Sequence, residues 1–293
     1  SSNDAGSINY SYTNRQGSPP SGEGNITKDP WFVDSGSGDY HLLPGSVCIN
    51  RGDISESDAD GTRRDMGVYI YTDAHQGPEW YVSSDGDQLT GDGSEGNPLS
   101  SILAAVNLAN EGNEIIVSEG TYTGEGNHNI YFLGKGVDLH SSGLVENTII
   151  DCQDISGDRG LVFEPHGSYP GETETTVIEG LTIRNGYFSN GTDGGGIYIN
   201  GASPVFNNCI IRDNEVYHHA HNSTSWGGGI YAYNSSSVFT NCVINNNKVD
   251  AQVNHNGSYD AWANGGGIYI SGTSNVTLQS CVIDSNWAYT YDH

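Results

Sequence analysis

A motif of three glycines followed by isoleucine and tyrosine occurs three times, at residues 194–198, 227–231 and 265–269. A cysteine follows the last glycine of each copy after 13, 13 and 14 residues. The inserts that lead into the three glycine triplets are much less constant, because they grow from 8 to 12 to 17 residues. A constant segment that alternates with a variable one is typical of stacked solenoid coils, in which the constant part forms the shared core.

Apolar residues alternate with polar or small ones inside the constant segment, as at Ile197, Ile199, Cys209 and Ile211. A period of two residues indicates strands rather than helices. One such coil cannot bury its own inward face, but parallel coils stacked at about 4.8 Å can. The sequence therefore predicts an all-β fold, a right-handed parallel β-helix.

Three columns of the repeat are expected to be structural. The glycines permit positive φ angles or close approach where a coil turns sharply. Asn214, Asn247 and Asn286 are expected in left-handed turns, with side-chain amides that bond to the next coil. The repeated cysteines are interpreted as a buried stack of small apolar residues rather than disulfides or a metal site. The five cysteines of the chain are Cys48, Cys152, Cys209, Cys242 and Cys281.

The pairing of Gly-Gly-Gly-Ile with Ile-x-x-Asn resembles the repeats of the polymorphic outer membrane protein and pectate-lyase-like β-helix superfamily. The usual form there is Gly-Gly-Ala-Ile with Phe-x-x-Asn, so glycine replaces alanine and isoleucine replaces phenylalanine in this chain. The resemblance covers roughly residues 79–293. It implies an architecture, and it brings polysaccharide lyases and hydrolases into view, although this fold carries many unrelated functions.

An enzyme of that kind needs a calcium-bound acidic cluster with a basic partner, or a set of close carboxylates. Asp151 and Asp154 have no basic residue nearby in the sequence. The position after the column isoleucine is mixed, since it reads Arg184, Arg212, Asn245 and Asp284. We therefore expect no enzymatic activity, with a polysaccharide lyase or glycoside hydrolase as the alternative.

The formal net charge is −26. This charge argues against binding to nucleic acid or to an anionic membrane, and it favours divalent cations. Asp58, Asp60 and Asp65 could offer carboxylates to calcium, because Asp-x-Asp-Gly is half of a calcium loop. The glutamate of the other half is absent, so a solvated acidic turn is the alternative. Arg51-Gly52-Asp53 is an integrin-like tripeptide that we interpret as a packed turn.

The order of segments predicts how copies connect. Residues 1–78 are similar to the closing segment of secreted bacterial β-helix proteins with surface anchors. Residues 72–97 are polar and glycine-rich, which is typical of a boundary. Residues 79–293, which begin within this boundary, are expected to open a second β-helix. We therefore expect residues 1–78 to finish the β-helix of a preceding copy, with residue 293 abutting residue 1 of the next, in one tandem chain or between subunits. The alternative is a fragment whose ends carry no meaning.

A capping α-helix is predicted near residues 98–111. Asn97 is the candidate N-cap, Pro98 the first helical residue, and Gly112 the end. Such a helix would cover the open N-terminal end of the coils. No stretch is apolar enough to span a bilayer, and the sequence shows no signal peptide.

The inserts leave one face of the solenoid and combine aromatic residues with N-glycosylation acceptors. Aromatic rings on such a face can stack on sugars, and the alternative is that they shield the coil edge. The residues expected to hold a ligand or glycan are Tyr187, Asn190, Tyr217, Asn222, Trp226, Asn256, Tyr259 and Trp262. Three further acceptor triplets begin at Asn25, Asn234 and Asn275.

These features favour an extracellular or cell-surface structural protein, a subunit or tandem repeat of a fibre or adhesin assembled head to tail. Its expected partners are copies of itself and carbohydrate, without nucleic acid or membrane insertion. Calcium is the cofactor considered. The competing interpretation is a polysaccharide lyase, a hydrolase or a carbohydrate-binding β-helix.

Overall fold

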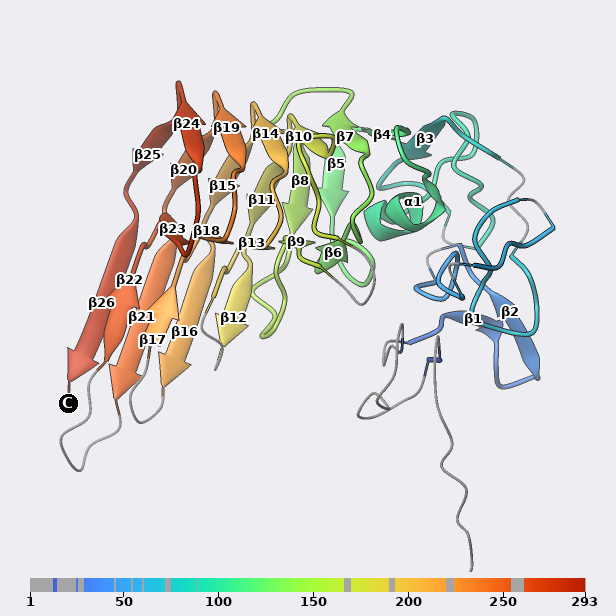
Figure 1. Cartoon of the computed structure of the whole chain (residues 1–293), viewed down its shortest axis with the longest axis horizontal. Helices are drawn as coiled ribbons and strands as arrows, with labels where there is room; N and C mark the ends of the chain where they lie inside the picture. Colours follow the sequence, from blue (N-terminus) through green and yellow to red (C-terminus); the bar gives the residue numbers. More distant parts are fainter. Residues whose placement is uncertain are drawn as a thin grey trace, which may run out of the picture.

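The computed structural model describes residues 13–14, 25, 29–44, 46–53, 55–59, 61–71, 75–87, 89–165, 170–189, 193–219, 224–253 and 261–292. From β3 (Glu79–Val82) to β26 (Trp287–Asp292) the chain is a stack of coils, with the helix α1 (Ile102–Leu108) at the end where β3 lies (Figure 1). The strands of successive coils pair in parallel. The predicted parallel β-helix is therefore confirmed.

Three sheets form the walls of the solenoid, and a complete coil adds one strand to each of the three. Sheet 1 consists of β3 (Glu79–Val82), β4 (Glu114–Val117), β7 (Asp138–Ser141), β10 (Val177–Glu179), β14 (Val205–Asn207), β19 (Val238–Thr240) and β24 (Thr277–Gln279). Sheet 2 consists of β5 (Gly120–Tyr122), β8 (Thr148–Asp151), β11 (Thr182–Arg184), β15 (Ile210–Arg212), β20 (Val243–Asn245) and β25 (Val282–Asp284). Sheet 3 consists of β6 (Ile130–Tyr131), β9 (Leu161–Phe163), β13 (Ile197–Asn200), β18 (Ile230–Tyr233) and β23 (Ile268–Ser271).

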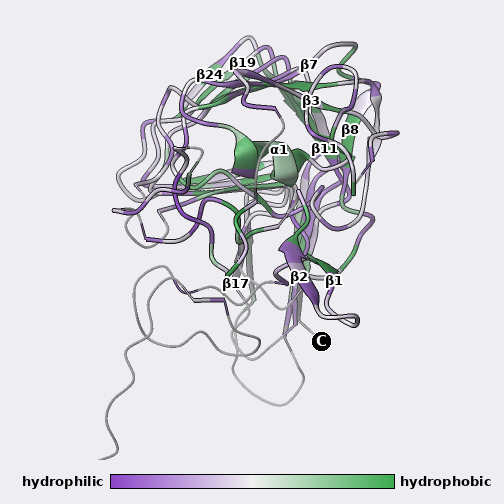
Figure 2. Ribbon diagram, turned by 90° about the vertical axis from the view of Figure 1, so that its right-hand side faces the viewer, coloured by the Kyte–Doolittle hydropathy of each residue, from purple (hydrophilic) through white to green (hydrophobic). Residues whose placement is uncertain are grey.

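The core is built from columns of like residues. Ile211 pairs in register with Ile183 on one side and Ile244 on the other, and all three are buried. The rings of Phe206 and Phe239 stack with their centroids 4.6 Å apart. Figure 2 shows hydrophobic strand segments around the enclosed interior. Each fully buried side chain of this size contributes about 1.5–3 kcal/mol, so the repeated pattern stabilises the stack coil by coil.

The predicted asparagine ladder is present. The side-chain amide of Asn214 donates to Asn247 Oδ1 at 2.9 Å, and that of Asn247 donates to Asn286 Oδ1 at 3.0 Å. The ladder asparagines were expected to have left-handed backbones, and this expectation is wrong. The left-handed residues are those just before them, including Asp213 (φ 57°) and Asn246 (φ 55°). The left-handed residue makes the turn, and the following asparagine then points into the stack.

The glycine triplet serves both purposes inferred from the sequence. Gly227 has a φ of +65°, which disfavours side chains. A Cβ atom on Gly228 would lie only 2.3 Å from the carbonyl oxygen of Lys248. The cysteine stack is also present, since Cys209 and Cys242 are buried and all five thiols are free.

The capping helix begins later than predicted. Its N-cap is Ser101, whose hydroxyl accepts a hydrogen bond from the backbone N–H of Ala104 at 3.1 Å, and its C-cap is Ala109. Asn97 and Pro98 precede the helix because the next residue, Leu99, forms a parallel bridge with Val82. No helix in the described residues is long and apolar enough to cross a membrane.

Residues of the first segment cover α1, so every residue of the helix is buried. The side-chain amide of Asn107 donates to the carbonyl oxygen of Ser46 at 3.2 Å, and Cys48 and Ile49 join the core cluster that includes the helix. The short hairpin of β1 (Phe32–Asp34) and β2 (Asp39–Leu42) belongs to the same segment. The division at residue 78 and the link to a preceding copy stay predictions.

The inserts form a projecting two-layer flange, which the sequence had indicated only as variable segments. One layer consists of β12 (Tyr187–Ser189), β16 (Glu215–His219), β21 (Lys248–Val253) and β26. The other consists of β17 (Thr224–Trp226) and β22 (Trp262–Asn264), which lead back to sheet 3. Buried Val216 and Val249 help to explain why the layers stay together.

Candidate functional site

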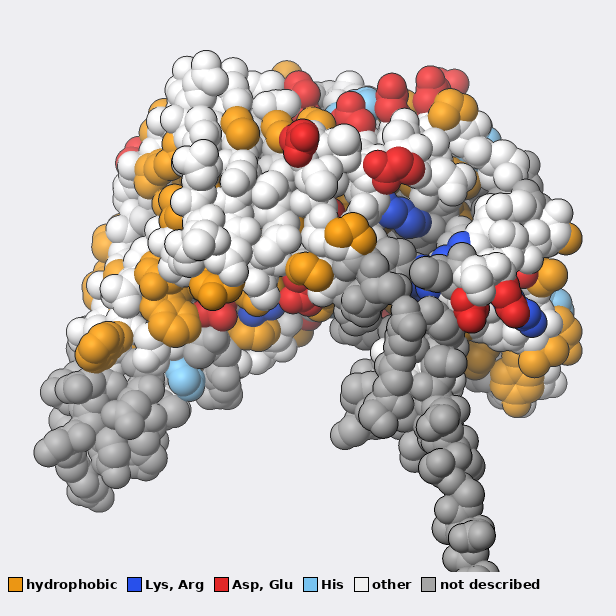
Figure 3. Space-filling view, in the orientation of Figure 1, with side chains coloured by type: hydrophobic (Ala, Val, Ile, Leu, Met, Phe, Trp, Pro, Cys, Tyr) orange, Lys and Arg blue, Asp and Glu red, His pale blue; other side chains and the backbone are white. Residues whose placement is uncertain are grey.

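The outer layer of the flange presents two tryptophans on one face. Strands β17 and β22 pair in register, with Thr224 opposite Trp262 and Trp226 opposite Asn264. In β17, Thr224 and Trp226 lie on the outer side, and Ser225 between them is buried. Trp262 is 58% exposed, an unusual state for so large an apolar ring. Figure 3 shows hydrophobic side chains gathered over the region where Figure 1 places β17, β22 and β23.

A row of tyrosines on the outer face of sheet 3 lies beside these tryptophans. Tyr198, Tyr231 and Tyr269 are in register on neighbouring strands, with ring centroids 5.4 and 5.9 Å apart. The ring of Trp226 stacks on Tyr269 at 5.7 Å and lies 6.5 Å from Tyr231. We call these three tyrosines, with Trp226 and Trp262, the aromatic corner.

The repeat motif itself creates this arrangement. The isoleucine after each glycine triplet is directed into the core, so the following tyrosine is directed outward. The tight glycine turn brings the end of β17 directly onto sheet 3, because Trp226 precedes Gly227 in the chain. The tyrosine row was missed as a site in the sequence, although strand alternation from the motif would have placed it on the outer surface.

Arg159 closes one end of the row. Its guanidinium carbon lies 3.6 Å from the ring centroid of Phe188 and 4.6 Å from that of Tyr198. One Nη atom donates to the carbonyl oxygen of Asp193 at 2.6 Å. Burial lowers the pKa of Arg159, and nearby tyrosines oppose this effect. The residue therefore serves as a packed cation between two rings.

Tyr187 and Tyr217 lie on the opposite face of the flange. They share that face with Glu215, Lys248 and Asp250, and the amine of Lys248 lies 2.9 Å from Glu215 Oε1 and 3.0 Å from Asp250 Oδ2. The structure thus separates the four described aromatic residues of the predicted ligand face into two pairs. Trp226 stacks on the tyrosine row and Trp262 lies on the neighbouring strand of the same layer, whereas Tyr187 and Tyr217 adjoin an ion-pair network.

The expected glycan acceptors are only partly described. Asn234 and Asn275 are exposed on turns between sheets 3 and 1, and Asn234 Oδ1 accepts a hydrogen bond from the N–H of Thr273 at 2.9 Å. Asn25 Oδ1 accepts one from the N–H of Thr13 at 2.9 Å. The remaining predicted positions that lie outside the described residues are Asn190, Asn222, Asn256 and Tyr259. Glycosylation stays a prediction.

The proposed calcium residues are engaged by the backbone. Asp65 accepts hydrogen bonds from the N–H groups of Asn50 and Tyr71, each at 2.7 Å, and Asp58 accepts one from the N–H of Asp65 at 2.9 Å. Asp60 lies outside the described residues. Within the described part of the chain, no three histidine, cysteine or acidic side chains are grouped to hold a metal. These contacts account for the acidic turn without an ion, and calcium stays a prediction.

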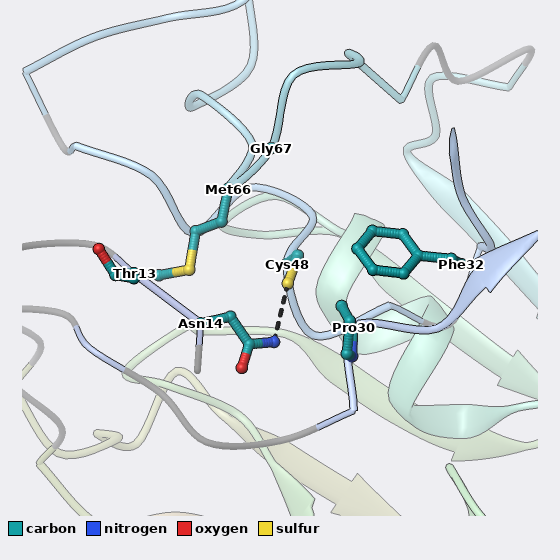
Figure 4. A pocket seen from close by; sticks show the side chains of 7 residues that line it. All are labelled: Thr13, Asn14, Pro30, Phe32, Cys48, Met66 and Gly67. Atoms are coloured by element: carbon teal, nitrogen blue, oxygen red, sulfur yellow. Dashed lines mark hydrogen bonds between the residues drawn. The ribbon is translucent and has the colours of Figure 1, made fainter. Parts of the chain in front are cut away.

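The covering segment also contains a cavity of about 430 Å³ (Figure 4). Cys48 and Met66 line it, and Asn14 Nδ2 donates to Cys48 Sγ at 3.2 Å. Burial raises the pKa of the Cys48 thiol, which keeps it protonated and unreactive at neutral pH. The integrin-like tripeptide lies nearby in sequence, and its Arg51 is buried, as the interpretation of a packed turn requires.

A charged cluster on sheet 2 corrects one inference about catalysis. Asp151 does have a basic partner, because Arg184 of the next coil approaches it at 2.8 Å. Burial opposes ionisation of Asp151, but hydrogen bonds from Asn185, Gln153 and Arg184 outweigh it and lower the pKa. Burial and the charges of Asp151 and Asp213 raise the pKa of Asp154. Asp151 is thus held ionised by structural contacts. Asp154 has the raised pKa, so it takes up a proton more readily than Asp151 does.

Comparisons with known proteins address the fold. No curated protein matches the sequence. Among solved structures, a pectate lyase is similar at 17% identity and a TM-score of 0.39, over 71% of this chain and 63% of that one. Pectin methylesterase from carrot gives 16% and 0.35, over 70% and 65%. A pectin methylesterase variant in complex with a hexasaccharide gives 11% and 0.32, over 59% and 55%.

The chain therefore spans less than two thirds of the length of each of these proteins. Likenesses at this level say nothing about its activity. A family model described as a right-handed β-helix region, however, matches residues 97–291, which is more than half of the chain. The match covers α1 and the coils that carry the aromatic corner. The chain belongs to the right-handed β-helix family.

Proposed function

We propose that this protein is an extracellular carbohydrate-binding β-helix and that the aromatic corner is its binding site. The observation that carries the proposal is the open ring of Trp262, 58% exposed, beside Trp226 and the tyrosine row. Exposed apolar surface is costly in water and commonly marks a binding surface. Aromatic rings offer sugars a flat apolar face, while the phenolic hydroxyls offer hydrogen bonds.

The flange supports this assignment because it is not needed to close the solenoid. Sheets 1 to 3 already enclose the core, and the inserts add surface on one side only. Insertions on one face of a solenoid commonly form its binding face. A role outside the cell is part of the same proposal, since polysaccharides are the ligands that such a surface would meet there.

Trp262→Ala tests the proposal directly. Trp287→Ala is the matched control, because Trp287 is 45% exposed but aligns with Lys248 on the other layer of the flange. Binding to a panel of soluble and insoluble polysaccharides should fall at least tenfold for Trp262→Ala and change little for the control. Equal losses in both variants, or retention in both, would place the site elsewhere.

Self-assembly into a fibre or adhesin is a second candidate, supported by the way the coils pair. Strands of successive coils align in parallel and in register, as β20 and β25 do at Ile244 and Ile283. The same pairing between copies would extend the stack into a fibre, because the edge of a sheet can recruit another chain. Ile283→Lys should then abolish concentration-dependent assembly in sedimentation velocity. Monomers at all concentrations for the unmodified protein would exclude this function.

Within the described residues, an enzymatic role is supported by the pair Asp151 and Asp154. The two carboxyl groups have pKa values shifted in opposite directions, as in sites that divide acid and base roles. Asp154→Asn should abolish polysaccharide cleavage if this pair is catalytic. Unchanged cleavage in that variant, or none in the unmodified protein, would favour the binding function alone.

A further inference from the structure

The tyrosine row presents hydroxyl groups rather than open ring faces. The planes of Tyr198 and Tyr231 differ by 7°, and those of Tyr231 and Tyr269 by 16°. Rings that stack on one another cover each other's faces, so the edge and the hydroxyl of each ring remain for a ligand. Burial raises the pKa of Tyr231 to about 12, which keeps its phenol a hydrogen-bond donor at neutral pH.

A second row of polar groups runs parallel to the first. Asn200, Tyr233 and Ser271 are in register on the same strands, two residues beyond the tyrosines. The side-chain amide of Asn200 donates to the hydroxyl of Tyr198 at 3.2 Å. Both rows are uncharged, and both repeat once per coil along the solenoid axis. They therefore form a hydrogen-bonding strip whose direction is that of the axis.

The spacing of the strip fits a chain of sugars. Centroids of successive tyrosines are 5.4 and 5.9 Å apart. A pyranose ring linked through opposite carbons advances an extended chain by about one ring length per sugar, which is comparable to this spacing. A glycan laid along the axis can therefore place one sugar at each coil, whereas a glycan laid along one strand would meet only one tyrosine of the row.

The surrounding charges select against an acidic ligand. Glu164 and Asp193 lie close enough to raise the pKa of Tyr198, after the larger effect of burial. The cation at the end of the row, Arg159, is already held between two rings and bonded to the backbone of Asp193. The whole chain carries a formal charge of −26, which repels polyanions at low salt.

We infer that the ligand of the aromatic corner is a neutral, extended polysaccharide of 1,4-linked pyranose units, bound parallel to the solenoid axis with one sugar per coil. This inference rests on the proposed function and adds the chemical class and direction of the ligand. The open ring of Trp262 covers one sugar face, and the tyrosine hydroxyls bond to sugar hydroxyls along the strip.

The test measures affinities by calorimetry for neutral 1,4-linked glucan, mannan and xylan oligosaccharides of increasing length, beside oligogalacturonates of equal length. Neutral oligosaccharides should bind more tightly at every length, with affinity rising as sugars are added up to at least the trimer. Tyr231→Phe, which removes one hydroxyl, should weaken binding about fivefold, as expected for one hydrogen bond. Tyr81→Phe on sheet 1 is the matched control and should change nothing.

The outcomes separate the two levels of the argument. Tighter binding of oligogalacturonates that is lost in Trp262→Ala would overturn the neutral ligand and keep the proposed function. Equal affinity for the monomer and the longer neutral oligosaccharides, or no effect of Tyr231→Phe, would overturn the axial strip. No binding of any glycan would overturn both the inference and the proposed function.

Discussion

Replacing Asn247 by alanine should be among the most damaging single changes in the regular coils. Its side chain is fully buried and makes four hydrogen bonds. The Nδ2 group donates to the carbonyl oxygen of Ile211 at 2.9 Å and to Asn286 Oδ1 at 3.0 Å. The Oδ1 atom accepts from the backbone and side-chain nitrogens of Asn214, at 3.1 and 2.9 Å.

The cost follows from these contacts. Each bond contributes about 1 kcal/mol net, and a buried partner left unsatisfied costs about 1–3 kcal/mol. Asn247→Ala should therefore lower the free energy of unfolding by about 4 kcal/mol. Asn286 makes three such bonds but is partly exposed, so Asn286→Ala should cost less, about 2 kcal/mol. Asn207, on the outer face of β14, takes no part in the ladder, and Asn207→Ala should cost about 0.5 kcal/mol or less.

Urea unfolding followed by circular dichroism gives the comparison. The midpoint should decrease in the order Asn207→Ala, Asn286→Ala, Asn247→Ala, with an unchanged slope. A changed slope would indicate that the coils no longer unfold together, which is a known risk in repeat proteins. If Asn247→Ala costs no more than Asn207→Ala, the ladder does not stabilise the stack and the reasoning fails.

Three further changes have defined outcomes. Burial raises the pKa of Glu172 from 4.5 to about 7. The contribution of this side chain to stability is therefore full below about pH 4.5 and is lost as the pH rises through about 7. Glu172→Gln should remove this pH dependence and should raise the melting temperature at pH 8 but not at pH 4. Gly228→Ala should prevent soluble expression because the new Cβ meets backbone, whereas Gly96→Ala, with open space around it, should express normally. Lys135→Met should lower the free energy of unfolding by about 2–4 kcal/mol in chemical denaturation, because the amine donates to three carbonyl groups at the end of α1 at 2.7 to 2.9 Å.

The fold could be predicted because its signal is local and repeated. Alternation at Ile197 and Ile199 indicates strands by itself, and repetition of the motif indicates stacking. The helix start could not be placed because Asn97 and Ser101 are both good N-caps. Only the pairing of Leu99 with Val82 decides between them, and that contact depends on the tertiary structure.

The site was predictable in part for the same reason. Trp226 and Trp262 were identified from their place in the inserts, but the flange strands that orient them were not. The alternation that would have revealed β16 is short and ends in two histidines. The contact between Asp151 and Arg184 joins two coils, so it depends on a register that no single stretch of sequence contains.

The ladder has a consequence for how the protein is made. Its contacts link positions 28, 33 and 39 residues apart, and each joins a coil to the one that precedes it in the chain. A ribosome adds about 5–20 residues per second, so a new coil emerges every few seconds onto a template that is already folded. The helix α1 and its covering segment precede the complete coils in the chain and provide a surface on which the first of these coils can pack. The chain can thus fold in the direction of its synthesis, since no coil waits for a partner that has yet to be translated.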